Sequence, residues 1–501
     1  MDFRHGCARA GSRSRRGDLT RTKRQRQRLS HVFCLRKLET RTLRFGVDSS
    51  ILLRTAATTN SRMKRIAVCV YTTNAAEVIR SFEIASAINR LHHDDVVINF
   101  FTYRGNFPGC KKRTVDYEHL IHGFDVNYFG GEDVVLDDAM WQAFREAELN
   151  RDGIFPPPYD HIATKYLRAV IDTLTKYQPD LLLYGLFPEA SLAAAIRGWK
   201  SVSFSAIERN SYIDWLSRLS CDTLAKIGVQ PNGGSRQKNP WAVIQNAAVE
   251  CGLDLKDPRD FMNAICPSCT ALCDFECFYD ETKLAPGVTI VGPIISSTNN
   301  SSSPTIQQIE AFLNSKDIES DTSHIKFLFS MGSSGKEPMF VECLKALNNA
   351  TPGEFRSVVL VPACLHESDL VNDILATAEQ NKDILIFKGF VPVRPILSLV
   401  NVFICHGGQL SVQCGLAAGL PIVGVPTQAD QCFNLQNVEV CNAGLCILPV
   451  DWKEKRIREA LRRVGKTPSY KREALKLQHE FFKDSGGAEK VASLVWNTLV
   501  C

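Results

Sequence analysis

The stretch FICHGGQLSVQCGLAAGLPIVGV, residues 403–425, has the pattern of one β-α-β unit. The apolar run NVFIC at 401–405 predicts a buried strand, and the run PIVGV at 421–425 predicts a second one. Between them, residues 409–418 favour a helix. Two strands joined by a helix lie parallel in one sheet, so this stretch predicts an α/β fold.

The same alternation extends to both sides of this unit. In the C-terminal half the pattern predicts strands at 325–330, 357–362 and 384–387, and helices at 337–348, 430–442, about 453–464 and about 468–482. In the N-terminal half it predicts strands at 65–72, 96–101, 180–185 and 202–205, and helices from Glu77, at about 163–177 and at 188–197. Strands that are nearly all apolar are typical of parallel sheets covered on both faces. We therefore expect two Rossmann-like doubly wound domains facing each other across a cleft.

Shifts in composition divide the chain into segments. Residues 1–62 carry 16 Lys or Arg against four acids and show little apolar periodicity, so we expect a disordered basic extension. Residues 63–294 and 305–485 are expected to form the N-terminal and C-terminal domains, joined by the turn-rich stretch 295–305. The remaining residues, 486–501, are expected to form a helix that packs back on the N-terminal domain.

The charge of the chain is distributed unevenly. The formal net charge of +5 combines +12 over residues 1–62 with −7 from Met63 onward. A mildly acidic body excludes a basic nucleic-acid-binding domain, and 45% hydrophobic content excludes a wholly disordered chain. The sequence has no apolar run long enough for a transmembrane helix and no secretory signal pattern at its start. We expect a soluble, cytoplasmic protein, with mitochondrial or nuclear targeting by the Arg-rich extension as the alternatives.

Eighteen cysteines without a secretory signal indicate reduced thiols instead of a disulfide framework. Four of them, Cys266, Cys269, Cys273 and Cys277, lie within twelve residues. This spacing fits ordinary packed thiols as well as a metal knuckle, because the second Cys-x-x-Cys pair of a zinc ribbon does not follow. We expect no metal site.

Residues His406, Gly407, Gly408 and Gln409 follow directly after the strand at 401–405. The glycines allow the backbone to approach a ligand, and the helix that starts at Gln409 presents free N–H groups and the positive end of its dipole. This arrangement predicts an anion site at the carboxyl end of the strand.

The next strand is followed by a turn with polar side chains, Asp430, Gln431 and Asn434, in the first part of a helix. A carboxylate beside amides at the mouth of a sheet suits hydrogen bonds to sugar hydroxyls. The two loops together therefore predict a site for an anionic sugar derivative.

The pattern His-x-Gly-x-x-Ser, Gly-x-Pro and Pro-x-x-x-Asp-Gln-x-x-Asn over residues 406–434 resembles the donor-binding signature of the UDP-glycosyltransferases. These are inverting enzymes with the two-Rossmann GT-B fold. The segments FSMGSSG at 329–335 and FVP at 390–392 are similar to further loops of that family. The resemblance covers most of the chain from Met63.

The resemblance implies roles for individual residues. Phe390 would stack on the uracil and the Val391 backbone would pair with the base edge, while Asp430 and Gln431 would hold the hexose. The diphosphate would be held by Gly332, Ser333, His406, Gly408 and Ser411, and Gly407 and Gln409 would be further donor-binding residues. The alternatives are that Phe390 is a core residue, that Ser333 caps the helix after it, and that His406 is structural.

Three positions depart from the family pattern. The Glu that binds the ribose hydroxyls in the family is replaced by Cys414, so the nucleotide specificity is open. The catalytic His and the Asp that orients it are replaced by Glu77 and Gly185. Glu77 is our candidate for the catalytic base, because burial can raise the pKa of a Glu toward neutral pH. Its alternative role is that of an ordinary acid at a helix N-terminus.

Other side chains of the N-terminal half are alternative bases, namely Glu189, His119, His122 and His161. The sequence also lacks an Asp-x-Asp metal motif at a strand end. The resemblance implies transfer of a hexosyl group from a UDP-sugar to an unknown acceptor, a small molecule or a lipid, without a cofactor. A nucleotide-sugar epimerase and a non-catalytic nucleotide-sugar-binding protein are the alternative functions.

Overall fold

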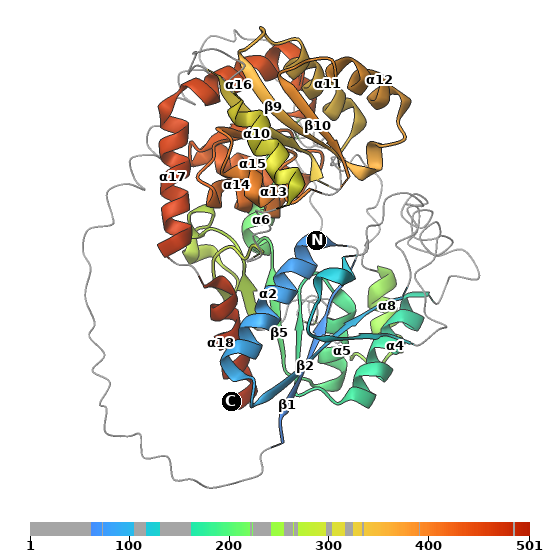
Figure 1. Ribbon diagram of the computed structural model, residues 1–501. Coiled ribbons are helices and arrows are strands. Elements are labelled where there is room, and N and C mark those ends of the chain that lie inside the picture. Colours follow the sequence, from blue (N-terminus) through green and yellow to red (C-terminus); the bar gives the residue numbers. More distant parts are fainter. Residues whose placement is uncertain are drawn as a thin grey trace, which may run out of the picture. The chain divides into compact units, whose positions relative to one another are not determined.

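The computed structural model describes residues 62–501 except residue 73 and the ranges 105–116, 131–161, 221–222, 224–241, 255–263, 265–268, 297–302, 316–323, 333–334, 390 and 484–485. The expected disordered extension, apart from Arg62, lies outside the described residues. Two parallel sheets run through the described part of the chain, one in each half of the sequence (Figure 1).

The N-terminal sheet has the strand order β3-β2-β1-β4-β5-β6-β7 with parallel neighbours. Its strands are β1 (Lys64–Cys69), β2 (Val96–Thr102), β3 (Asp125–Tyr128), β4 (Leu181–Tyr184), β5 (Ser201–Ser205), β6 (Thr270–Leu272) and β7 (Val288–Ile290). β1 and β4 are neighbours, with Cys69 paired to Tyr184, although β2 and β3 come between them in the sequence. The chain therefore reverses its course across the sheet between β1 and β4, which opens a crevice at their carboxyl ends.

The C-terminal sheet repeats this plan with the order β10-β9-β8-β11-β12-β13. Its strands are β8 (Ile325–Ser330), β9 (Phe355–Val361), β10 (Ile384–Lys388), β11 (Val402–Cys405), β12 (Ile422–Gly424) and β13 (Gly444–Cys446). Here β8 and β11 are the neighbours at which the order reverses, and Cys405 pairs with Ser330. The second crevice therefore opens where the loops after Ser330 and Cys405 diverge.

Helices connect the strands in both halves. The α-helices are α2 (Ala75–His92), α4 (Ile162–Tyr177), α5 (Pro188–Arg197), α6 (Arg209–Ser217), α8 (Ala242–Glu250), α10 (Pro304–Asn314), α11 (Glu337–Asn348), α12 (Asp369–Ala378), α13 (Val393–Leu397), α14 (Gln409–Ala417), α15 (Ala429–Val440), α16 (Glu454–Lys466), α17 (Pro468–Lys483) and α18 (Gly487–Val500). Short 3-10 turns are η1 (Glu118–Leu120), η3 (Glu276–Phe278), η4 (Glu281–Lys283), η6 (Ala363–Leu365) and η7 (Pro449–Asp451).

Both faces of each sheet are buried. Along β8, Phe327 and Phe329 belong to one hydrophobic cluster while Leu328 belongs to another. Along β1, Ala67 and Val68 are divided between two clusters in the same way. Since successive side chains of a strand point to opposite faces, helices cover both sides, and this explains the uninterrupted apolar runs. The expected fold class is confirmed.

The two halves are in contact within the described residues. On α14, the Gln413 Nε2 donates to the Cys273 carbonyl at 2.7 Å and to the Asp274 carboxylate at 3.0 Å. The Trp215 indole of α6 donates to the Gln436 side chain of α15 at 2.8 Å. Residues after β5 and β6 of the first sheet thus rest on the helices that follow β11 and β12 of the second.

The last helix, α18, packs on the N-terminal half. Val491 lies in the same hydrophobic cluster as Ile84 of α2. The Trp496 ring stacks on His92, also of α2, with the ring centroids 4.0 Å apart. The end of the chain therefore returns from the C-terminal sheet to the N-terminal one.

Candidate functional site

The loops after β8 and β11 bring three of the predicted donor residues together. His406 follows β11 directly, and its ring lies between Gly332 and Gly408. A Cβ atom at Gly332 would lie 2.7 Å from His406 Cε1, and one at Gly408 would lie 2.7 Å from His406 Nε2. The two glycines are therefore required by the close approach of the imidazole.

His406 is a buried polar residue with unused hydrogen-bonding capacity. Its side chain is 6% exposed, and its Nδ1 has no hydrogen-bond partner among the described residues. Burial lowers the pKa of His406 from 6.5 to about 4, so the ring is neutral at pH 7. A neutral imidazole beside glycine N–H groups can donate a hydrogen bond to an oxygen of a bound anion.

Helix α14 begins at this point. Its N-cap is Gly408, and no side chain caps the first turn in the described structure. Ser411 lies in that turn and is half-buried. The uncapped N–H groups, the helix dipole and the Ser411 hydroxyl together form a site that suits a phosphate group.

Two of the predicted donor residues, Asn434 and Gln431, form hydrogen bonds that support the loops around them. Asn434 is 1% exposed and donates through Nδ2 to the Gly407 carbonyl at 3.0 Å. The Gln431 Oε1 accepts from the N–H of Thr427 at 2.8 Å and from its hydroxyl at 2.9 Å. These contacts hold Gly407 at its φ of +89° and fix the turn that precedes α15.

Asp430 is the acid of this crevice. It lies half-buried in the first turn of α15, and burial raises its pKa. The pKa of the neighbouring Tyr212 is raised to about 12, by burial and then by the charge of Asp430. A carboxylate that is neither fully buried nor fully solvated is suited to accept hydrogen bonds from sugar hydroxyls.

Two other predicted donor residues, Ser333 and Phe390, lie outside the described residues. Val391 is 8% exposed and belongs to the hydrophobic cluster around α13 and α14. Cys414 lines a cavity of about 370 Å³ together with Arg394. Burial raises the pKa of Cys414 to about 11, so the thiol stays protonated and contributes no charge there.

The crevice of the N-terminal sheet contains Glu77, on the first turn of α2, beside Gly185, which follows β4. A Cβ atom at Gly185 would lie 1.7 Å from Glu77 Oε2. The same oxygen accepts the Leu186 N–H at 3.1 Å. The carboxylate of Glu77 therefore occupies the space that any side chain at position 185 would need.

Glu77 forms an ion pair with Arg80, whose Nη1 lies 3.3 Å from Glu77 Oε1. Arg80 is 1% exposed and also donates through Nη2 to the side chain of Gln409. Gln409 in turn donates to the Ala206 carbonyl. A chain of polar contacts thus connects the candidate base to the first residue of α14, and Gln409 spans the two halves.

Opposing effects set the pKa of Glu77. Burial raises this pKa, while the charge of Arg80 and the Leu186 N–H lower it. Nothing in the composition or in the family pattern singles out Arg80. A signal was nevertheless present, because Arg80 is a charged residue in a helix that is otherwise mostly apolar.

Glu189 is a second carboxyl near this crevice, and it is half-buried. The Tyr71 hydroxyl donates to its two oxygens at 3.0 and 2.9 Å. The Tyr71 ring stacks on Phe187 with the centroids 4.4 Å apart. Burial raises the pKa of Glu189, and the bond from Tyr71 lowers it. This pair was not predicted, since Tyr71 and Glu189 are far apart in the sequence.

The remaining candidates do not join these sites. His119 and His122 are exposed, and the His122 ring packs on Phe82 with the centroids 4.4 Å apart. His161 and Cys266 lie outside the described residues. No group of three or more His, Cys, Asp or Glu side chains in the described ranges is arranged to hold a metal ion.

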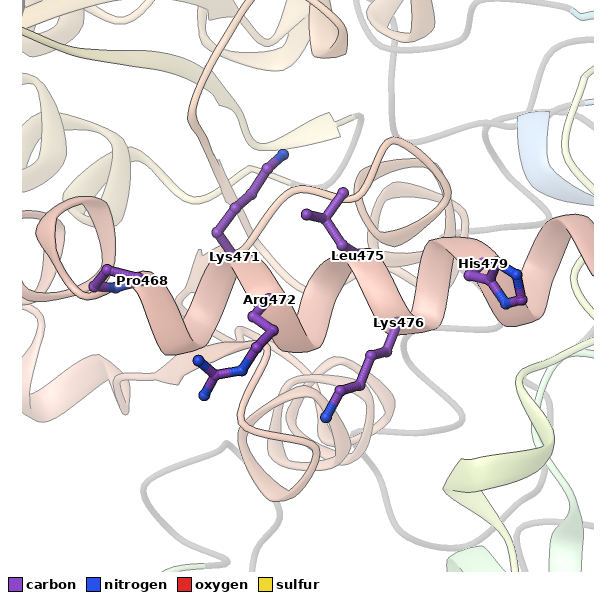
Figure 2. A pocket seen from close by; sticks show the side chains of 6 residues that line it. All are labelled: Pro468, Lys471, Arg472, Leu475, Lys476 and His479. Carbon is purple, nitrogen blue, oxygen red and sulfur yellow. The ribbon is translucent and has the colours of Figure 1, made fainter.

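A hollow on helix α17 is separate from both crevices (Figure 2). Its lining residues all come from that one helix: Pro468, Lys471, Arg472, Leu475, Lys476 and His479. None of them follows a strand end, so this hollow has no part in the candidate site. None of the described helices combines the length and hydrophobicity of a transmembrane span.

Comparison with known proteins agrees with this fold. The glycosyltransferase of kitacinnamycin matches 87% of the chain and 99% of its own length, with a TM-score of 0.61 at 17% identity. A UDP-glucosyltransferase from Polygonum tinctorium matches 88% of the chain and 100% of its own length, with a TM-score of 0.61 at 16% identity. The chain therefore has the GT-B fold of glycosyltransferases.

The sequence of the C-terminal half is more specific. Residues 379–496 match the family model described as Erythromycin biosynthesis protein CIII-like, C-terminal domain. The NDP-glycosyltransferase YjiC of Bacillus licheniformis is 35% identical over 102 residues, which are 20% of this chain and 26% of that protein. Human 2-hydroxyacylsphingosine 1-beta-galactosyltransferase is 32% identical over 102 residues, 20% of this chain and 18% of that protein.

The chain matches about a quarter of the length of these curated relatives. The named relatives and structures are glycosyltransferases and none is an epimerase, in agreement with the resemblance seen in the sequence. The predicted relationship to nucleotide-sugar glycosyltransferases is confirmed.

Proposed function

We propose that the protein is an inverting glycosyltransferase that moves a hexosyl group from a UDP-sugar to an acceptor hydroxyl in the cytoplasm. The observation that carries this proposal is the arrangement of the loops after β8 and β11. There, Gly332 and Gly408 flank a neutral His406 at the uncapped start of α14. The glycosyltransferase names of the relatives of the C-terminal half support it.

The donor would lie across this loop pair. Its diphosphate would accept hydrogen bonds from the N–H groups of α14, from His406 and from Ser411. Its hexose would reach Asp430, which lies half-buried in the first turn of α15. Ser333 and Phe390 are assigned to the diphosphate and the base by the family resemblance alone.

The transfer would start with the acceptor in the N-terminal crevice. The acceptor oxygen attacks C1 of the sugar while its proton passes to the Glu77 carboxylate. The bond from C1 to the phosphate oxygen breaks on the opposite face, so the configuration at C1 inverts. The electron pair remains on UDP, and the helix N-terminus with His406 stabilises the developing charge.

Glu77 fits the role of base in its position and in its environment. It stands on the first turn after β1, and Arg80 connects it to Gln409 at the start of α14. Burial raises its pKa, which makes the carboxylate a stronger base, while Arg80 and the Leu186 N–H keep it ionised. The acceptor, a small molecule or a lipid, is left open by this geometry.

The proposal is tested by incubating the protein with UDP-glucose, UDP-galactose and UDP-N-acetylglucosamine and a panel of phenols, sterols and ceramides. We expect release of UDP that depends on the acceptor, and NMR of the product should show a β-linked sugar from an α-linked donor. Binding of UDP without release in any combination would favour the non-catalytic binding protein. Release of a free sugar with altered stereochemistry at C2 would favour the epimerase.

A further inference from the structure

Two cysteines from distant parts of the sequence lie side by side. Cys277 is in η3, which follows β6, and Cys441 is the C-cap of α15. Their Sγ atoms are 4.0 Å apart, although 164 residues separate them in the chain. A disulfide places the two Sγ atoms about 2 Å apart, so the pair has to close by about 2 Å to form the bond.

The backbone on each side of the pair is fixed by packing. Phe275 and Phe278 flank Cys277 and lie in the hydrophobic cluster that also contains Phe433 and Val438 of α15. The Tyr279 hydroxyl donates to Asp274 at 2.8 Å and braces the same segment. Because both elements are anchored in one cluster, the two thiols stay close together.

The pair is open to small oxidants. Cys277 is exposed and Cys441 is half-buried, whereas Cys273, Cys343 and Cys405 are buried. The contact between the two sulfur atoms lowers the pKa of Cys441. The carboxylates of Glu480 and Glu473 act against this effect. Cys441 is therefore the thiol of the pair that ionises more easily.

We infer that Cys277 and Cys441 are a reversible oxidation site, at which a peroxide converts the two thiols into a disulfide that joins the β6–β7 connection to helix α15. The Cys441 thiolate attacks one peroxide oxygen and becomes a sulfenic acid, and the first water leaves. Cys277 then attacks the Cys441 sulfur, forming the S–S bond and releasing the second water. Two thiols lose two electrons and two protons in total, and a dithiol reductant reverses the step.

This disulfide has a mechanical consequence. It would connect the N-terminal sheet covalently to the helix that carries Asp430 and Gln431 at its other end. It would also close a loop of more than 160 residues in the unfolded chain, which lowers the entropy of the unfolded state. The inference concerns these thiols alone and does not depend on the proposed transferase activity.

In the test, the purified full chain is treated with dilute hydrogen peroxide and its free thiols are blocked with iodoacetamide. The protein is then digested with trypsin and a Glu-specific protease. These cuts release Cys277 in the peptide 277–281, which contains no other cysteine, and Cys441 in the peptide 440–453. We expect a peptide pair joined through Cys277 and Cys441 that dithiothreitol separates. We also expect the oxidised protein to unfold at a temperature higher by roughly 5 °C.

Matched variants decide the outcome. Cys277→Ser and Cys441→Ser should abolish both the linked peptides and the temperature rise, whereas Cys501→Ser, which removes another exposed thiol, should change neither. The inference is overturned if peroxide leaves Cys277 and Cys441 as readily alkylated as Cys501. It is also overturned if peptide 277–281 is linked to a cysteine other than Cys441 in the wild-type chain.

Discussion

The two crevices have the same position in their sheets, but one holds a neutral histidine between two glycines, whereas the other contains a buried ion pair. In the C-terminal sheet, the loops after β8 and β11 present Gly332, Gly408 and a neutral His406, without an ion pair among these residues. In the N-terminal sheet, the loops after β1 and β4 hold a buried ion pair, Glu77 with Arg80. The residues of the first crevice form no ion pair with one another, whereas the proposed base of the second is held in an ion pair.

The difference shows how a catalytic pair can be replaced without leaving a cavity. Gly185 stands where the resembling family has an acid, and the Glu77 carboxylate occupies the space beside it. The substitutions at positions 77 and 185 are therefore coupled, since either one alone would create a clash or a void. The C-terminal crevice, in contrast, has the glycines that the close approach of His406 requires.

The largest effect is expected from Glu77→Gln, which keeps the shape of the side chain and removes its basicity. We expect the rate of UDP release to fall roughly 100- to 10,000-fold, because the acceptor proton has no other base in the proposed mechanism. Calorimetry should show an unchanged affinity for UDP. The control is Glu83→Gln on the same helix, which should retain full turnover. Normal turnover of Glu77→Gln would show that another group is the catalytic base, and Glu189 would be the first candidate.

Gly185→Asp tests the coupling of the two positions. The new side chain would begin 1.7 Å from Glu77 Oε2 and bring a second carboxylate into the crevice, so we expect a loss of about 2–4 kcal/mol in the free energy of unfolding. Adding Glu77→His should recover part of this loss, because it removes one of the two carboxylates and allows a His–Asp pair, whereas the close contact with Phe204 Cε2 at 2.5 Å remains. Urea denaturation measures both variants. Equal stability of Gly185→Asp and wild type would show that the Glu77 carboxylate does not fill this space.

The burial of His406 predicts a dependence of stability on pH. Its pKa is about 4 in the folded chain against 6.5 as the ordinary value, so the unfolded state binds more protons between these limits. Stability therefore falls as the pH decreases below about 6.5, by about 2 kcal/mol down to about pH 5. We expect the difference in unfolding free energy between wild type and His406→Gln to shrink by this amount over that range. If the difference in unfolding free energy between wild type and His406→Gln did not change with pH, the imidazole would be exposed to solvent.

The smallest effect is expected from Gly332→Ala. The added methyl would lie 2.7 Å from His406 Cε1 at a backbone φ of +57°, so we expect roughly tenfold weaker UDP binding and about 1 kcal/mol lower stability. Gly123→Ala is the matched control, since Gly123 has a φ of +79° and open space around it. It should lose stability without losing affinity. If Gly332→Ala and wild type bound UDP with equal affinity, Gly332 would not be part of the donor site.

Much of the fold follows from the apolar pattern of the sequence. The predicted bounds of β8 and α11, 325–330 and 337–348, agree with the structure, because long buried runs and amphipathic helices leave a strong periodic signal. The strands β6, β7 and β13 were not predicted. Each has three residues, too few to show a period, and each is a strand only because a neighbour in the sheet supplies the hydrogen bonds.

Only the part of the candidate site that lies in one continuous segment could be predicted from the sequence. The loop from His406 to Gln409 is one continuous segment, so its anion-binding character can be read from neighbouring residues. The contacts of Glu77 with Leu186 and of Tyr71 with Glu189 join residues more than 100 positions apart. Such pairs depend on the strand order, which brings β1 and β4 together. No local pattern contains that information.

The central claim is that the carboxyl ends of β8 and β11 bind the nucleotide of a sugar donor. Calorimetric titration of the wild-type chain, His406→Ala and His366→Ala with UDP tests it most directly. His366 is a half-buried histidine of the same domain that contacts the Val361 carbonyl, and it serves as the matched control. We expect wild type and His366→Ala to bind UDP equally and His406→Ala to bind it at least tenfold more weakly. Absence of binding to the wild type, or equal binding by His406→Ala, would contradict it.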